Sequence, residues 1–251
     1  MKKTIIILAT IVCLVVLATC FAGCTISLEN ANYVTTNHNQ LDSFDNIYVD
    51  TDVANVIIKK TDGPCKVTCF ETDKLYHKVK VEDGTLKIES ITKNHVNYTG
   101  IVRPLSVTVY LPEKKYANLE IESDTGNVSV SKDLTFKDID ISCDTGNVTL
   151  DTINCSALTI DSDTGNMLLS DIVASATINV NVDTGDIVLS DCDAPVINLE
   201  TELGNVRGSL LTGKTFVVKS ELGDIDVPDN DPTGGVCTIN TDLGDIDITI
   251  A

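Results

Sequence analysis

Seven acidic turn motifs carry the side chains with the clearest chemical potential in this sequence. In each motif an Asp or Glu stands two positions before a glycine. Grouped carboxylates can bind hard cations such as Ca²⁺, share a proton in acid–base catalysis, or attract a positively charged partner. The acidic residues are Asp124, Asp144, Asp163, Asp183, Glu202, Glu221 and Asp242, and the glycines are Gly126, Gly146, Gly165, Gly185, Gly204, Gly223 and Gly244.

The first four motifs read Asp-Thr-Gly, which is also the active-site triplet of aspartic proteases. That chemistry needs two such loops that face each other, so that two close carboxylates share one proton. Here the triplet recurs at a period of about 20 residues, and the last three copies read Glu-Leu-Gly or Asp-Leu-Gly. A turn role explains all seven copies, so we expect no protease activity.

The acidic column could hold cations if the repeats stack in register. The carboxylates would then lie roughly 4.8 Å apart, and two unscreened charges at that distance repel by about 0.9 kcal/mol in water. Bound Ca²⁺ would offset this repulsion; alternatively, each carboxylate caps the amides of its own turn and salt screens the rest. The Gly-Gly-x-Gly-x-Asp nonapeptide of calcium-binding β-rolls is missing from the sequence. We therefore expect no dedicated cofactor, and at most weak association of several Ca²⁺ ions.

The residues around each glycine indicate the elements that position these carboxylates. Apolar residues stand seven and five positions before the glycine and two and four positions after it, as in Leu119, Ile121, Val128 and Val130. This alternation has the period of a β-strand with one buried face. The glycine would supply a positive φ, and the Asn or Asp after it tolerates the left-handed region. We predict an all-β fold, a β-solenoid of about 20-residue repeats, with a repeating antiparallel sandwich as the alternative.

The chain divides into four segments on this interpretation. Residues 119–251 form the seven-copy repeat region, and residues 41–118 form an irregular β N-terminal cap, because terminal repeats are expected to be atypical. Within the cap, Ala54 takes the glycine position of a decayed turn motif, and Asp83-Gly84 between two alternating runs predicts a hairpin. Residues 24–40 read as a tether, and residues 1–23 as an export signal.

The N-terminus resembles a bacterial lipoprotein signal peptide. Lys2 and Lys3 precede an apolar run, which ends in Phe21-Ala22-Gly23-Cys24. The resemblance implies cleavage before Cys24 and lipidation of its thiol, which would anchor the chain to a membrane. An uncleaved anchor and plain secretion are the alternatives. All three predict an extracytoplasmic, envelope location.

The net charge and the positions of the cysteines limit the classes of function that this sequence can have. The net charge is −19, and the repeat region holds five basic residues, namely Lys132, Lys137, Arg207, Lys214 and Lys219. Nucleic acid is therefore an unsuitable partner, because phosphate binding needs a basic face. Cys143, Cys192 and Cys237 fit core positions as small hydrophobic residues. Cys65 and Cys69 could form a disulfide only if a turn intervenes, because a four-residue strand keeps their Cα atoms roughly 13 Å apart.

The Leu111-Pro112 element, followed by units of strand, Asp-Thr-Gly-Asn turn and strand, resembles a bacterial family of β-strand-repeat domains of unknown function labelled putative adhesin. The resemblance implies an all-β, envelope-associated protein and carries over no catalytic residues. We expect a non-enzymatic surface lipoprotein, an adhesin or scaffold that binds an unidentified surface ligand or protein. A polyanionic sensor or decoy for cations or cationic peptides is the alternative, and a polysaccharide-active β-helix enzyme is a third class.

Overall fold

The computed structural model describes residues 31–39, 41–92 and 103–251. These residues form strands β1 to β19 and one 3₁₀ turn, Pro232–Gly234, and they include no α-helix. The all-β prediction is confirmed for this part of the chain. None of the described residues belongs to a helix that could cross a membrane. The predicted signal segment and Cys24 lie outside the described residues.

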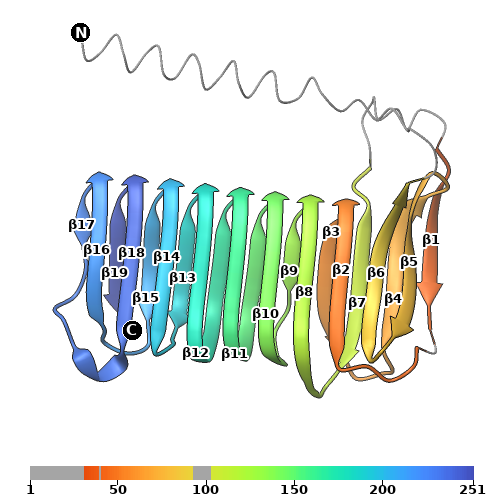
Figure 1. The fold of residues 1–251 in the computed structure, drawn as a ribbon, viewed down its shortest axis with the longest axis horizontal. Helices are drawn as coiled ribbons and strands as arrows, with labels where there is room; N and C mark the ends of the chain where they lie inside the picture. The colour runs from red at the N-terminus through yellow and green to blue at the C-terminus, as the bar shows by residue number, and fades with distance from the viewer. Residues whose placement is uncertain (1–30, 40, 93–102) are drawn as a thin grey trace, which may run out of the picture.

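The strands lie in two layers that face each other (Figure 1). The front layer runs, from one end to the other, β5 (Leu75–Glu82), β6 (Thr85–Thr92), β2 (Asn46–Val53), β8 (Lys115–Thr125), β10 (Leu134–Thr145), the second halves of β11 (Val148–Thr164) and β12 (Met167–Thr184), β14 (Val196–Leu203), β18 (Val236–Leu243) and β16 (Thr215–Leu222).

The back layer contains the strands that follow each turn. It runs β1 (Tyr33–His38), β4 (Lys66–Thr72), β7 (Ser106–Pro112), β3 (Asn55–Thr61), β9 (Val128–Val130), the first halves of β11 and β12, β13 (Ile187–Cys192), β15 (Val206–Leu210), β19 (Ile246–Ile250) and β17 (Ile225–Asp226). The two long strands β11 and β12 therefore take part in both layers.

The core lies between the two layers because most strands bury alternate side chains. In β10, Ile139 and Ile141 point inward and are buried, while Asp140 between them is exposed. Val128 and Val130 do the same from the back layer. A single repeat exposes its apolar face, so stacking against neighbours is what removes these side chains from water.

Neighbouring repeats pair in parallel from β2 and β3 to the far end of the stack. The antiparallel sandwich alternative is therefore wrong for residues 115–250. Antiparallel pairing occurs at the N-terminal end, where β1, β4 and β7 pair in one layer and β5 and β6 in the other. The predicted hairpin is confirmed, with Asp83 and Gly84 at φ 50° and 72°. Residues 33–38, which we expected in the tether, form β1.

The last two repeats are stacked in the reverse of their sequence order (Figure 1). Strand β14 pairs with β18, and β18 pairs in turn with β16. The repeat of Gly244 therefore lies between those of Gly204 and Gly223, and the chain returns through residues 227–235 to insert it. A continuous order along the sequence, which the regular spacing suggests, does not hold here.

Candidate functional site

The turn glycines form a column that lets adjacent repeats approach closely. A Cβ on Gly165 would lie 1.9 Å from the carbonyl oxygen of Gly146, and one on Gly146 would lie 2.0 Å from that of Gly126. Gly126 to Gly185 have φ of 154–157°, whereas Gly204 has no such φ and the same 1.9 Å approach. Close approach, rather than positive φ alone, therefore explains glycine at this position.

Left-handed backbone occurs at the opposite corner of the repeats. Asp133, Thr152, Asp171 and Asp191 have φ of 52–63° there. The residues that follow the turn glycines are not among the described residues with positive φ, so our expectation that Asn127 and its equivalents use the left-handed region is wrong. Asp and Asn tolerate this conformation better than most residues, which is the signal in the sequence that could have located this corner.

The residue after each glycine links the repeats through its side chain. The backbone N–H of Asn147 donates to Oδ1 of Asn127 at 2.9 Å, and that of Asn166 donates to Oδ1 of Asn147 at 2.8 Å. The same bond recurs at every described turn, through Asn55, Asn127, Asn147, Asn166, Asp186, Asn205, Asp245 and Asp224. We call this series the Asn/Asp ladder.

The turn amides are thus bonded to neighbouring repeats. In the first motif Gly126 N–H donates to Thr145 O at 3.0 Å, and Val128 N–H donates to Asn147 O at 2.9 Å. Asn127 N–H donates to Asn55. The alternative in which Asp124 and its equivalents cap the amides of their own turns is therefore wrong. Their carboxylates face solvent, and that of Glu221 accepts from Lys219 Nζ at 2.9 Å.

Small hydroxyl groups on the inner side of the turns satisfy the glycine carbonyl oxygens. Thr201 Oγ1 donates to Gly185 O at 3.0 Å, and Thr241 Oγ1 donates to Gly204 O at 3.1 Å. Thr201 and Thr241 are buried, where an unpaired polar group would be costly. Sequence analysis missed this row, although a small polar residue three positions before the glycine is its signal.

The register brings the seven predicted carboxylates into one exposed row along the front layer. Asp124 and Asp144 lie between the paired residues Ser123–Cys143 and Thr125–Thr145, and the later repeats align in the same way. At the far end the order is Glu202, Asp242, Glu221. Asp52 adds an eighth carboxylate at the N-terminal end of the row. Whether cations bind this row stays a prediction.

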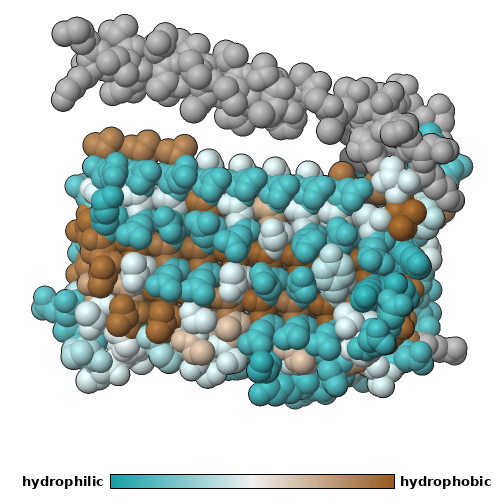
Figure 2. All heavy atoms as spheres, viewed as in Figure 1, coloured by the Kyte–Doolittle hydropathy of each residue, from teal (hydrophilic) through white to brown (hydrophobic). Residues whose placement is uncertain are grey.

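A second group of carboxylates lies beside this row on β2, β8, β10 and β11. We call the group the acidic face, and it consists of Asp50, Glu120, Glu122, Asp140 and Asp161. Figure 2 shows hydrophilic side chains in rows along this layer. Partial burial and the neighbouring carboxylates Glu122 and Asp161 raise the pKa values of Asp50, Glu120 and Asp140, with Glu122 acting on all three. The same causes raise the pKa of Asp124, which faces Asp144 and Asp52.

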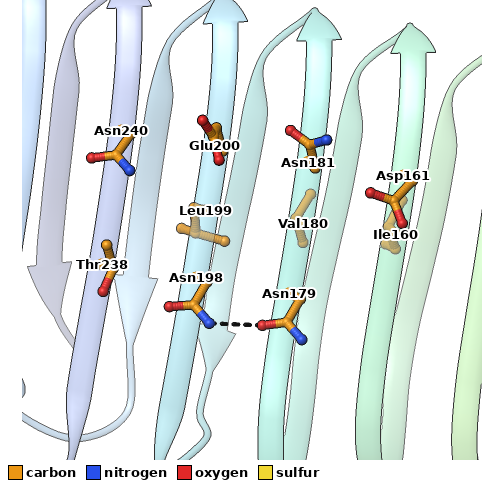
Figure 3. A pocket seen from close by; sticks show the side chains of 10 residues that line it. All are labelled: Ile160, Asp161, Asn179, Val180, Asn181, Asn198, Leu199, Glu200, Thr238 and Asn240. Atoms are coloured by element: carbon orange, nitrogen blue, oxygen red, sulfur yellow. Dashed lines mark hydrogen bonds between the residues drawn. The ribbon is translucent and has the colours of Figure 1, made fainter.

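Next to the acidic face, the front layer has a shallow hollow of about 300 Å³ (Figure 3). Asn198 Nδ2 donates to Asn179 Oδ1 at 2.8 Å at one side of it. Asp161, Asn181, Glu200 and Asn240 also line it, over apolar side chains of the core. These amides and carboxylates can bind hydroxyl, amine or guanidinium groups of a partner.

The predicted basic residues are dispersed. Arg207, on the back layer, lies 3.3 Å from Asp186 and borders a hollow with Asp247. Lys132 and Lys137 make exposed ion pairs. Lys214 is buried instead, and its Nζ donates to Asp193 Oδ1, Thr212 Oγ1 and the carbonyl oxygens of Ala194 and Gly234. Sequence analysis did not foresee this role, because a lysine gives no local signal of burial.

The described cysteines are free thiols. Cys143, Cys192 and Cys237 are buried, which confirms their expected core positions. No turn separates Cys65 from Cys69, because β4 begins at Lys66. Phe44 and Tyr116 are the buried aromatic residues among the described part of residues 41–118, and Tyr116 packs against both Phe44 and Phe136.

Comparisons with known proteins address the family and the fold. A family model described as Toastrack DUF4097 matches residues 44–251. A putative adhesin from Bacteroides fragilis is similar in structure at 15% identity and TM-score 0.49, covering 87% of this chain and 97% of the other. A putative adhesin from Parabacteroides distasonis has 15% identity and TM-score 0.44, covering 88% and 98%.

A putative lipid binding protein from Parabacteroides distasonis is similar at 12% identity and TM-score 0.34, covering 88% of this chain and 98% of the other. No curated protein matches the chain.

Proposed function

Because the chain belongs to the Toastrack DUF4097 family, we propose that it is a non-enzymatic, envelope-anchored protein whose repeats form a rigid β-solenoid for adhesion or scaffolding. The resemblance of residues 1–24 to a lipoprotein signal supports the anchor. The observation that carries the proposal is the in-register row of carboxylates beside the acidic face. Parallel pairing holds these charges at fixed spacing, so that a partner meets a preformed surface.

The acidic face suits a partner with several positive charges, such as a lysine- or arginine-rich protein segment. Partial burial, followed by repulsion from neighbouring carboxylates that include Glu122 in each case, raises the pKa values of Asp50, Glu120 and Asp140. A cationic partner would relieve that repulsion, and the attraction would also speed association at low salt. The alternative function, a sensor or decoy for cationic peptides, would use the same surface. It differs from adhesion or scaffolding in the biological consequence of binding, not in the binding chemistry.

Binding of a labelled lysine-rich peptide to the full chain would test this surface. We expect affinity to fall with rising salt, and to fall about tenfold when Glu122→Gln, Asp140→Asn and Asp161→Asn are combined. The matched control is Asp247→Asn, which removes one exposed charge from β19 in the back layer. Equal losses in the triple variant and the control, or no loss in either, would contradict the proposal.

Divalent cations are a second candidate for the carboxylate row, and the mutual repulsion of Asp124, Asp144 and Asp52 favours it. The experiment is thermal unfolding of the full chain with Ca²⁺ or Mg²⁺ at constant ionic strength. Saturable stabilisation by Ca²⁺ would indicate sites in the native state. Equal, unsaturable shifts with both ions would indicate screening alone.

The non-enzymatic part of the proposal is tested separately. A lyase assay on acidic polysaccharides should detect no turnover. Turnover that is lost in Arg207→Ala would overturn this part, because Arg207 lies beside the carboxylates of Asp186 and Asp247 in the back-layer hollow.

A further inference from the structure

We propose that the N-terminal end of the stack contains a binding site for a divalent transition-metal ion, Zn²⁺ by its donor chemistry, formed by Cys69, Glu71 and His77. This site is distinct from the acidic row and face. Thiolate, carboxylate and imidazole are the three ligand types that Zn²⁺ accepts in proteins, usually with tetrahedral geometry. One ligand atom from each of the three residues lies within 4.8 Å of the other two.

The ligands come from both layers. Cys69 and Glu71 are two residues apart on β4, so both side chains point inward from the back layer. His77 lies on β5 of the front layer, and it meets Glu71 across the interior. Tetrahedral bonds of 2.0–2.3 Å place donor atoms about 3.3–3.7 Å apart. The present separations, at most 4.8 Å, therefore exceed that geometry by no more than about 1.5 Å.

Burial makes this cluster unlike the exposed carboxylates elsewhere. Cys69, Glu71 and His77 are 0%, 4% and 3% exposed. Nε2 of His77 is buried and has no hydrogen-bond partner. A buried polar atom without a partner is rare and costs free energy. The imidazole that carries this unpartnered nitrogen has a ring nitrogen within 4.8 Å of the Cys69 thiol and the Glu71 carboxylate, which is the independent observation that points to a ligand.

Hydrogen bonds already orient the carboxylate and the imidazole. Glu71 Oε2 accepts from the backbone N–H of His77 at 2.7 Å and lies 3.3 Å from His77 Nδ1. Glu71 Oε1 accepts from Thr36 Oγ1 on β1. These hydrogen bonds hold the carboxylate in a fixed orientation, and a carboxylate has further lone pairs for a metal.

Charge balance favours a dication in this place. The form of Cys69 that binds a metal is the thiolate, so its thiol proton must leave when a metal binds. On binding, the metal displaces this proton to solvent, and the resulting thiolate and the Glu71 carboxylate together neutralise the two positive charges. The imidazole adds a neutral donor, and the fourth position is left for water.

A metal here would join the two layers at the end of the stack. Strands β1 and β5 are the edge strands there, and no further repeat pairs with them among the described residues. A metal bound to β4 and β5 would hold the two layers together at this end, and its binding to the native state would add directly to stability.

Co²⁺ is the direct probe, because a bond to thiolate gives an intense near-ultraviolet charge-transfer band that carboxylates alone do not give. The full chain is stripped of metal, kept reduced, and titrated with Co²⁺ in excess Ca²⁺, which occupies exposed carboxylates. We expect one equivalent to bind, and Zn²⁺ to abolish the band. Cys69→Ser should remove the band, and His77→Gln should weaken Co²⁺ binding roughly tenfold or more.

The matched control is Cys143→Ser, which changes a buried thiol of the repeat region and should keep the band. Zn²⁺ should raise the melting temperature of the parent and of Cys143→Ser, but not that of Cys69→Ser. Each protein is compared with its own metal-free form, so a variant with lower intrinsic stability can still be interpreted. Absence of the band in the parent, or its survival in Cys69→Ser, would overturn the proposal. Peptide binding by the acidic face is unaffected either way.

Discussion

Between Leu119 and Leu210 each repeat lies between two neighbouring repeats, whereas the two ends of the stack are stabilised by other kinds of contact. In the middle, each turn motif supplies a glycine contact and an Asn/Asp ladder bond to its neighbour, and the turn of Thr201 adds a buried hydroxyl bond. At the N-terminal end, antiparallel strands and the Cys69–Glu71–His77 cluster replace these bonds.

At the C-terminal end, the last two repeats stack in reversed order, the buried Lys214 makes the stabilising contacts, and several apolar side chains are exposed. Figure 2 shows hydrophobic side chains over β14, β18 and β16, where Leu203, Leu243 and Leu222 replace the threonines of the earlier turns. The comparison teaches that repetition stabilises the middle through identical small contacts, while each end depends on a few particular side chains.

The largest expected effect comes from a Cβ in the middle of the glycine column. Gly165→Ala would place that atom 1.9 Å from Gly146 O, and backbone of the paired repeat cannot move without disturbing the ladder. We expect a loss of about 3 kcal/mol or more in the free energy of unfolding, measured by urea denaturation. Gly63→Ala is the control, because its nearest neighbour would be at an ordinary 3.6 Å. Similar midpoints for the two variants would refute the close-approach explanation.

The C-terminal end should depend on Lys214. Lys214→Met removes the buried cation beside Asp193 and leaves the carbonyl oxygens of Ala194 and Gly234 without this donor, and we expect a loss of about 2–4 kcal/mol in the free energy of unfolding. Hydrogen exchange should show faster opening of β16 and β18 than of β10 and β11. Lys219→Met serves as the control, because Lys219 forms an exposed ion pair with Glu221 and such pairs contribute at most about 1 kcal/mol. Uniformly faster exchange along the whole stack would contradict a local role.

A smaller effect is expected from one member of the Asn/Asp ladder. Asn147→Ala removes the acceptor of Asn166 N–H, and an exposed hydrogen bond contributes about 1 kcal/mol. Asn181→Ala on the front layer is the comparison, because that residue lies outside the ladder and should change stability by less than half as much. Chemical denaturation of both variants provides the test, and equal stabilities would mean that the ladder bonds add nothing.

The smallest effect concerns pH. Neighbouring carboxylates and partial burial raise the pKa of Asp124 in the folded chain, so the native state binds its proton more tightly than the unfolded state does. Stability should therefore increase slightly as pH falls from 7 toward the raised pKa, and decrease as pH rises through it. Asp124→Asn should gain about 0.3–0.5 kcal/mol at pH 7 and low salt, and its stability should depend less on pH. Melting temperatures across pH 4.5–7.5 would check this, and a parent that loses stability on acidification over that range would show the opposite sign.

The repeated part of the sequence predicts most of the structure of residues 119–251. The alternation around Ile139 and Ile141 predicts strands with a buried face, and the spacing of Gly126, Gly146 and Gly165 predicts that equivalent turns align. The column of carboxylates follows from that alignment. The role of the glycine itself was predicted less well, because a contact with the carbonyl oxygen of another repeat cannot be seen in one turn.

The all-β class, the inward face of each strand and the repeated turn could be predicted from the sequence, because they depend on patterns within about 20 residues. The parallel pairing, the reversed order of the last two repeats, the burial of Lys214 and the meeting of Cys69, Glu71 and His77 could not be predicted. Repeats with the same alternation of apolar residues can pair equally well with several other repeats. The choice among partners is made by non-local contacts, such as those that Lys214 forms with Asp193 and Gly234.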